Sequence, residues 1–200
     1  MLRAAISVAI LSMSIPCGAQ NVAAPADAYQ VRYAANLTVG DSVVNMTNTG
    51  VNGGFDPGGN ICANVYALDA NQSLVACCTC PLTPNHLKTL SVRRDLISNT
   101  LTPGVPTAIT VALLASSQPS CNASTPTAAN LSGGLRAWGT TIHTLPSGAM
   151  GVTETAFEQS VLSTSEMSKL TLYCGFIQAI GSGYGICQSC REGAQGAVRQ

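Results

Sequence analysis

The clearest hydrophobic pattern in this chain lies at residues 60–81 (NICANVYALDANQSLVACCTCP). Residues 61–68 alternate between two sets of side chains with a period of two, which places the two sets on opposite faces of a strand. Residues 69–72 (DANQ) have turn-forming side chains, and residues 73–80 return as a second strand. The stretch therefore predicts a β-hairpin around which the rest of the chain packs, and it holds four of the nine cysteines.

Shorter segments with the same alternation, or with many β-branched residues, predict further strands. They are residues 29–33, 42–47, 87–92, 107–115, 135–144 and 152–157. Segments 48–60 and 116–134 are rich in Gly, Asn, Ser, Thr and Pro, so we expect loops there. The charged triplet Arg93-Arg94-Asp95 is expected at a solvated corner.

The period changes after residue 162. Ser163 and Glu166 match a capping box, apolar residues recur at 167, 170, 174 and 177, and Gly181 is a natural stop. We expect one helix over about residues 164–180, followed by a Gly-rich, cysteine-containing tail. The fold class expected is therefore mainly β: a sandwich-like antiparallel domain with one C-terminal helix, stapled by disulfides.

The N-terminus has the order of a secretory signal peptide. Arg3 supplies a positive charge, residues 4–15 are mostly apolar, and small residues precede Gln20. Cleavage is expected after Ala19, which leaves residues 20–200 as one domain without a transmembrane segment. Pro16 stands where a lipoprotein would need a small residue before Cys17, which argues against acylation. The expected location is secreted, periplasmic or at the cell surface.

Charge narrows the range of partners. Once Arg3 is lost, 8 basic side chains face 9 acidic ones, and charged residues make up only 9% of the whole chain. There is no basic field for nucleic acid or anionic lipid. The partner is expected to be an unknown protein or an envelope component.

Cysteine content is the strongest physical signal. An even number in an exported chain predicts a disulfide framework, although the spacing leaves the connectivity open. The eight candidates are Cys62, Cys77, Cys78, Cys80, Cys121, Cys174, Cys187 and Cys190. With the hairpin turn centred on residues 69–70, Cys62 lies opposite Cys77, which predicts a bridge between them.

Two further bridges are expected from position. A disulfide through Cys121 would restrain the long loop at 116–134. The tail has little apolar surface with which to dock unaided, and ordering it is costly. At least one bridge is therefore expected among Cys174, Cys187 and Cys190, or from them to Cys78 or Cys80.

The alternative to disulfides is a thiol-based metal or redox site. Cys78, Cys80, Cys187 and Cys190 could supply four thiolates to zinc or an iron–sulfur centre. Cys187-x-x-Cys190 could also be a redox pair, but the strand and helix that such a motif needs are missing around it. Export to an oxidising compartment favours disulfides, so no cofactor is expected.

A third interpretation is an extracellular hydrolase. The chain has two histidines, His86 and His143, and no G-x-S-x-G elbow. Glu154 and Glu158 could form a carboxylate pair for glycoside cleavage, but two exposed acids beside a strand end explain them more simply.

Two aromatic residues, Trp138 and Tyr66, could stack on a sugar ring. Each lies in an alternating apolar segment. Core packing is therefore expected for both.

The segments NICANVYALD, CCTCPLTPN, LRAWGT, TETAF and CGFIQAIGSGYGIC together resemble a group of exported bacterial proteins of unknown function. The resemblance extends from about residue 60 to residue 190 and implies a secreted, β-rich, cysteine-rich domain. It implies no activity and no functional residue. The function expected is a non-catalytic structural or interaction module of the cell surface or extracellular space.

Overall fold

The computed structural model describes residues 20–53, 57–117 and 119–190, which form nine strands and one α-helix. The strands are β1 (Tyr29–Ala34), β2 (Asp41–Asn48), β3 (Ile61–Leu68), β4 (Leu74–Leu82), β5 (Leu87–Ser91), β6 (Ile109–Ser116), β7 (Leu135–Thr144), β8 (Met150–Ala156) and β9 (Glu158–Gln159). The helix is α1 (Thr164–Ile180), and the short helical turns are η1 (Pro57–Gly59), η2 (Val92–Leu96) and η3 (Ala128–Asn130). The mainly-β prediction is confirmed, whereas the predicted signal peptide lies outside the described residues.

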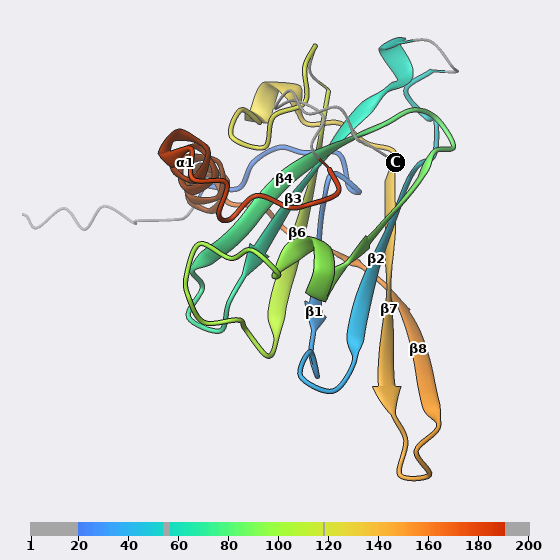
Figure 1. Cartoon of the computed structure of the whole chain (residues 1–200). Coiled ribbons are helices and arrows are strands. Elements are labelled where there is room, and N and C mark those ends of the chain that lie inside the picture. Colours follow the sequence, from blue (N-terminus) through green and yellow to red (C-terminus); the bar gives the residue numbers. More distant parts are fainter. Residues whose placement is uncertain (1–19, 54–56, 118, 191–200) are drawn as a thin grey trace, which may run out of the picture.

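The strands form two antiparallel sheets that pack face to face. One sheet has the order β4-β3-β6-β1-β9 and the other has the order β5-β2-β7-β8. Helix α1 covers the outer face of the five-stranded sheet, so the molecule has three layers rather than the two of a simple sandwich (Figure 1). The outer face of the four-stranded sheet is left without a covering layer in the described part of the chain.

The predicted hairpin is β3–β4, and every residue of β3 is buried. Alternation explains this, because Val65 lies in the core between the sheets and Tyr66 lies in the cluster beneath α1. The Tyr66 hydroxyl donates a hydrogen bond to the Ala123 carbonyl at 2.7 Å. Burial raises the pKa of Tyr66 above its ordinary value. The expectation that Tyr66 is a core residue is confirmed.

The helix begins and ends where the sequence predicted. The Ser163 hydroxyl accepts a hydrogen bond from the Glu166 backbone N–H, which satisfies one of the free donors of the first turn. Gly181 ends the helix with a φ of 66°, a left-handed conformation that glycine adopts without a steric penalty. The buried residues of α1 are Leu170, Cys174 and Ile177, three of the four positions expected on the core face.

Two local predictions are corrected by the structure. The strand expected at 87–92 ends at Ser91, because the chain turns there into η2. Trp138 is not a core residue: it is half-buried and pairs with Asn45 of β2, whose side chain bonds to the hydroxyls of Thr89 and Thr140 on the uncovered outer face. The alternation of residues 135–144 correctly predicts the strand β7, but which of its two faces is covered depends on the other layers.

Gly40 precedes β2 at a point where the backbone passes close to β7. A Cβ atom at this position would lie 1.9 Å from the carbonyl oxygen of Ile142, which is backbone and has little freedom to move. We therefore expect Gly40→Ala to lower the free energy of unfolding by about 2–3 kcal/mol, as overpacking does. Chemical denaturation measures this difference.

Gly104→Ala is the matched control. Gly104 is exposed, and a Cβ atom there would meet nothing within 4 Å. We expect this variant to unfold at the same midpoint as the parent, or slightly above it. Equal stability of the Gly40→Ala and parent proteins would contradict the close approach of the Gly40 backbone to the Ile142 carbonyl.

Candidate functional site

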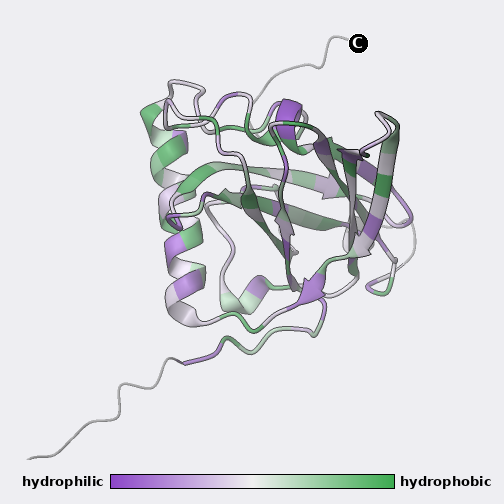
Figure 2. Ribbon diagram, turned by 90° about the horizontal axis from the view of Figure 1, so that it is seen from below, coloured by the Kyte–Doolittle hydropathy of each residue, from purple (hydrophilic) through white to green (hydrophobic). Residues whose placement is uncertain are grey.

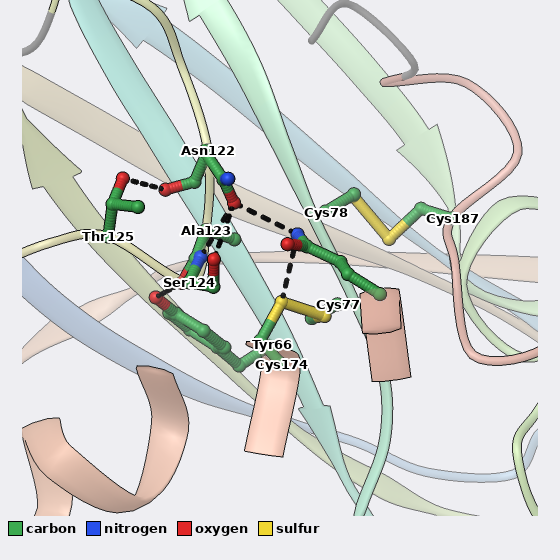
Figure 3. The surroundings of a disulfide bond; sticks show 10 residues. Tyr66, Cys77, Cys78, Asn122, Ala123, Ser124, Thr125, Cys174 and Cys187 are labelled. Carbon is green, nitrogen blue, oxygen red and sulfur yellow. Dashed lines mark hydrogen bonds between the residues drawn. A yellow bond between two sulfur atoms is a disulfide. The ribbon is translucent and has the colours of Figure 1, made fainter. Parts of the chain in front are cut away.

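Strand β4 carries disulfides on both of its faces. Cys77 points towards α1 and bonds to Cys174 with a Cα–Cα distance of 5.8 Å. Cys78 and Cys80 point into the core between the sheets and bond to Cys187 and Cys190 of the tail. Figure 3 shows the Cys77–Cys174 and Cys78–Cys187 bonds leaving the strand in different directions. One strand is thus cross-linked to both the helix and the tail.

The fourth disulfide joins Cys62 to Cys121 and restrains the loop between β6 and β7, as expected for Cys121. The predicted Cys62–Cys77 bridge is wrong. Both residues face α1, but Cys62 lies opposite Pro81 and Cys77 lies opposite Tyr66. The register is four residues away from the expected one, which separates the two cysteines by about 13 Å along the strands.

The tail covers the open edge of β4. The Cys77 N–H donates to the Gly185 carbonyl at 2.8 Å, and Cys77 and Ile186 form an isolated parallel bridge. Gly185 has a φ of 75°, and a Cβ there would meet Ile177 of α1 at 2.9 Å, so glycine suits this position. The predicted clamp of helix and tail by cysteine is confirmed, and it protects backbone groups that an edge strand would otherwise expose.

Asp95 anchors the tail from the other sheet. Its carboxylate accepts hydrogen bonds from Arg94, from the Ser91 N–H at 2.7 Å and from the Ser189 hydroxyl at 2.7 Å. Only 2% of the residue is exposed, so the expected solvated corner is wrong for Asp95, although Arg93 and Arg94 are exposed. Burial alone would raise the pKa of Asp95, but hydrogen bonds from Arg94, Ser189 and Ser91 outweigh it and hold the pKa below its usual value.

The three disulfides of β4 are placed for structure rather than for exchange. Cys77, Cys174, Cys80 and Cys187 are each exposed by 1% or less, whereas thiol–disulfide exchange needs an accessible sulfur. The four cysteines considered as metal ligands do come together, but they lie in the Cys78–Cys187 and Cys80–Cys190 bonds. A metal would need thiolates, so these bonds would first have to be reduced.

Helix α1 exposes a second apolar face that the sequence reading missed. Leu172, Phe176 and Ile180 recur every four residues on the side away from the sheet, and Tyr173 lies beside them. Leu172 is 67% exposed and Phe176 is 60% exposed. Figure 2 shows hydrophobic colour reaching the outside of the helix as well as its inside. We call these four residues the α1 stripe.

A pocket of about 440 Å³ adjoins the α1 stripe. Tyr173 and Phe176 form part of its wall, together with Ile177, Lys169 and Leu101. The β3–β4 turn forms another wall, through residues 71–74. Large apolar side chains that lie exposed beside a hollow are a feature of surfaces that bind other proteins.

The helix cannot rotate to bury the stripe. Cys174 is bonded to Cys77 (Figure 3). The Gln178 side chain donates a hydrogen bond to the Asn122 side-chain oxygen at 3.0 Å. These contacts fix the inner face of α1 against the sheet. The stripe is therefore held towards solvent.

The residues considered for hydrolysis are not assembled into a site. Glu154 lies on β8, whereas Glu158 lies on β9 in the other sheet. His86 is exposed in a turn, and His143 lies on β7. The Glu154 carboxylate accepts a hydrogen bond from Thr140, an ordinary contact across two strands.

No known protein family, no curated protein and no solved structure matches this chain. The resemblance to exported bacterial proteins thus stays a prediction. No helix among the described residues is long and apolar enough to cross a membrane. Four disulfides are typical of proteins from an extracellular or otherwise oxidising compartment.

Removing the Cys80–Cys190 bond should free the end of the tail beyond Cys187. In Cys80→Ala/Cys190→Ala no unpaired thiol is left, and only a short ring is opened in the unfolded chain because Cys78–Cys187 still closes almost the same loop. We therefore expect the free energy of unfolding to fall by about 2 kcal/mol. Limited proteolysis should then cut within residues 188–190.

The control for this variant is Cys62→Ala/Cys121→Ala, which opens the loop between β6 and β7 instead. It should expose that loop to protease and leave the tail protected. A tail that resists protease equally in both variants would show that it is not held by Cys190.

The low pKa of Asp95 predicts a pH dependence of stability. Because the pKa is lower in the folded protein, the stabilisation is complete above the unfolded value of about 3.9 and is lost as pH falls through the folded value. Asp95→Asn should cost about 1–3 kcal/mol near neutral pH. The difference from the parent should shrink as pH falls below about 4.

Denaturant titrations at several pH values measure this difference. Glu158→Gln, which makes the same change at an exposed position, should match the parent throughout. An Asp95→Asn difference that stays constant down to low pH would contradict the role given to the carboxylate.

Proposed function

We propose that this protein is an exported, non-catalytic interaction module of the cell surface or extracellular space, and that its contact surface is the α1 stripe. The observation that carries this is the outward apolar face of a helix whose inner face is fixed by a disulfide. The signal-like N-terminus and the four disulfides support export, and the resemblance to exported bacterial proteins supports a bacterial source.

The partner is a protein that offers an apolar groove. Side chains three or four residues apart on one face are the anchors by which a helix binds such a groove. Leu172, Phe176 and Ile180 have this spacing, and the adjoining pocket receives a side chain from the partner. Aromatic anchors beside a pocket are typical of the residues that dominate binding energy.

Charge argues against a lipid surface as the partner. Lys169 and Glu166 are the only charged residues of α1, and they cancel. Helices that lie in membrane interfaces are usually rich in Lys and Arg on their polar face, because anionic lipids attract them. The stripe supplies apolar area without that attraction.

Replacing two anchors tests the proposal. Leu172→Ser/Phe176→Ser removes exposed apolar area, so folding stability should change by no more than about 0.5 kcal/mol. Co-purification from the native envelope should lose one specific partner at least tenfold. That corresponds to about 1.4 kcal/mol of binding free energy or more.

Tyr33→Ser is the control, because Tyr33 is 64% exposed and lies on β1, away from the helix. The same amount of partner should co-purify with Tyr33→Ser as with the parent. If the double variant also co-purifies with an undiminished amount of partner, the proposal is overturned. Equal binding of the parent to protein-free vesicles of envelope lipid would overturn the choice of a protein partner.

A further inference from the structure

The two sheets end in four edge strands, and they are protected unequally. The tail covers β4, β9 has only two residues, and β5 is short and carries Lys88, a residue that discourages edge pairing. Strand β8 has seven residues, MGVTETA, without Lys, Arg or Pro. It belongs to a hairpin that extends beyond the neighbouring strands (Figure 1). Among the described strands it pairs with β7 alone.

The hydrogen-bond pattern shows which backbone groups of β8 are available. At one end of the hairpin the Leu145 N–H donates to the Ala149 carbonyl, and at the other the Phe157 N–H donates to the Ala137 carbonyl. Antiparallel ladders alternate, so the odd-numbered residues of β8 bond to β7. The N–H and C=O groups of Met150, Val152, Glu154 and Ala156 therefore point away from β7.

We propose that a second copy of this chain pairs with β8 through its own β8, antiparallel and across a two-fold axis at Thr153. This inference does not depend on the α1 stripe. The pairing would join two four-stranded sheets into one continuous sheet. Without the predicted signal peptide, 8 basic side chains face 9 acidic ones, so a net charge of about −1 on each copy causes little repulsion between them.

Self-complementarity selects this register. Only even-numbered residues can exchange hydrogen bonds across the new edge. Centring the axis on Glu154 would place two like charges directly opposite, and centring it on Val152 would leave Ala156 unpaired.

With the axis at Thr153, Met150 faces the partner's Ala156 and Val152 faces the partner's Glu154. All four residues then bond, giving about eight backbone hydrogen bonds.

The apolar side chains of the strand support the same occupant. Met150 is 58% exposed and Val152 is 65% exposed, on the outer face of the sheet. Pairing would cover part of both. An interface of this kind takes most of its affinity from the main chain, as in other cases of strand addition.

Proline at position 152 tests the edge directly. Because the Val152 N–H points away from β7, Val152→Pro removes a donor of the new interface and leaves the β7–β8 ladder intact. We expect the parent to sediment as a dimer and Val152→Pro to dissociate at least tenfold more readily. Val152→Thr keeps the N–H and should remain a dimer. A parent that stays monomeric at its highest soluble concentration, or a Val152→Pro protein as dimeric as the parent, overturns the inference.

A cysteine tests the register. Thr153 lies opposite the partner's Thr153 in a non-hydrogen-bonded pair, where the Cα atoms are about 4.5 Å apart and a disulfide fits. Mild oxidation of purified Thr153→Cys should give a covalent dimer. Glu154→Cys should not, because the two copies of residue 154 are diagonal neighbours about 7–8 Å apart. Cross-linking of Glu154→Cys but not of Thr153→Cys overturns the register, and cross-linking of neither overturns the β8 interface.

Discussion

The structure depends on the alternation of side chains along β4. Cys77 and Cys78 are adjacent in sequence, and a strand sends adjacent side chains to opposite faces. One of them is therefore bonded to the helix that covers the sheet, and the other is bonded to the tail within the sandwich. With Cys80 beside Cys78, three disulfides meet on one edge strand. An edge strand that would otherwise be open is thereby buried and cross-linked.

This arrangement decides which face of α1 is presented to solvent. Apolar residues occur on both sides of the helix, so hydrophobic burial alone gives only a weak preference for one orientation. The Cys77–Cys174 bond, together with the contact between Gln178 and Asn122, selects the face with Leu170 and Ile177 for the core. The stripe with Leu172 and Phe176 is then left outside. Contiguous exposed apolar side chains of this kind are a common feature of interaction surfaces.

The two sides of the sandwich are closed by different means. On the side of β4, the tail fills the space between the sheets, where Asp95 and two disulfides hold it. On the other side, the chain passes from β8 to β9 through buried Phe157, and Arg32 of β1 donates hydrogen bonds to Thr141 and Thr155. The far end of the β7–β8 hairpin lies beyond both closures. Together with the uncovered outer face of the four-stranded sheet, this explains why β8 is mostly exposed whereas every residue of β3 is buried.

The sequence determined the local elements and the need for cross-links. Periodicity placed the β3–β4 hairpin, and the cap at Ser163 with the stop at Gly181 placed the helix, because these signals act over a few residues. The even cysteine count and the Gly-rich tail predicted a clamp. The sequence did not determine the register of the hairpin, because a turn of five residues with a bulge near Ala67 shifts the pairing and separates Cys62 from Cys77. The sequence also did not show that Asp95 is buried, that Trp138 is only half-buried, or that Phe176 is exposed. Alternation and helical spacing define two faces of an element, but only the packing of distant layers decides which of them is covered.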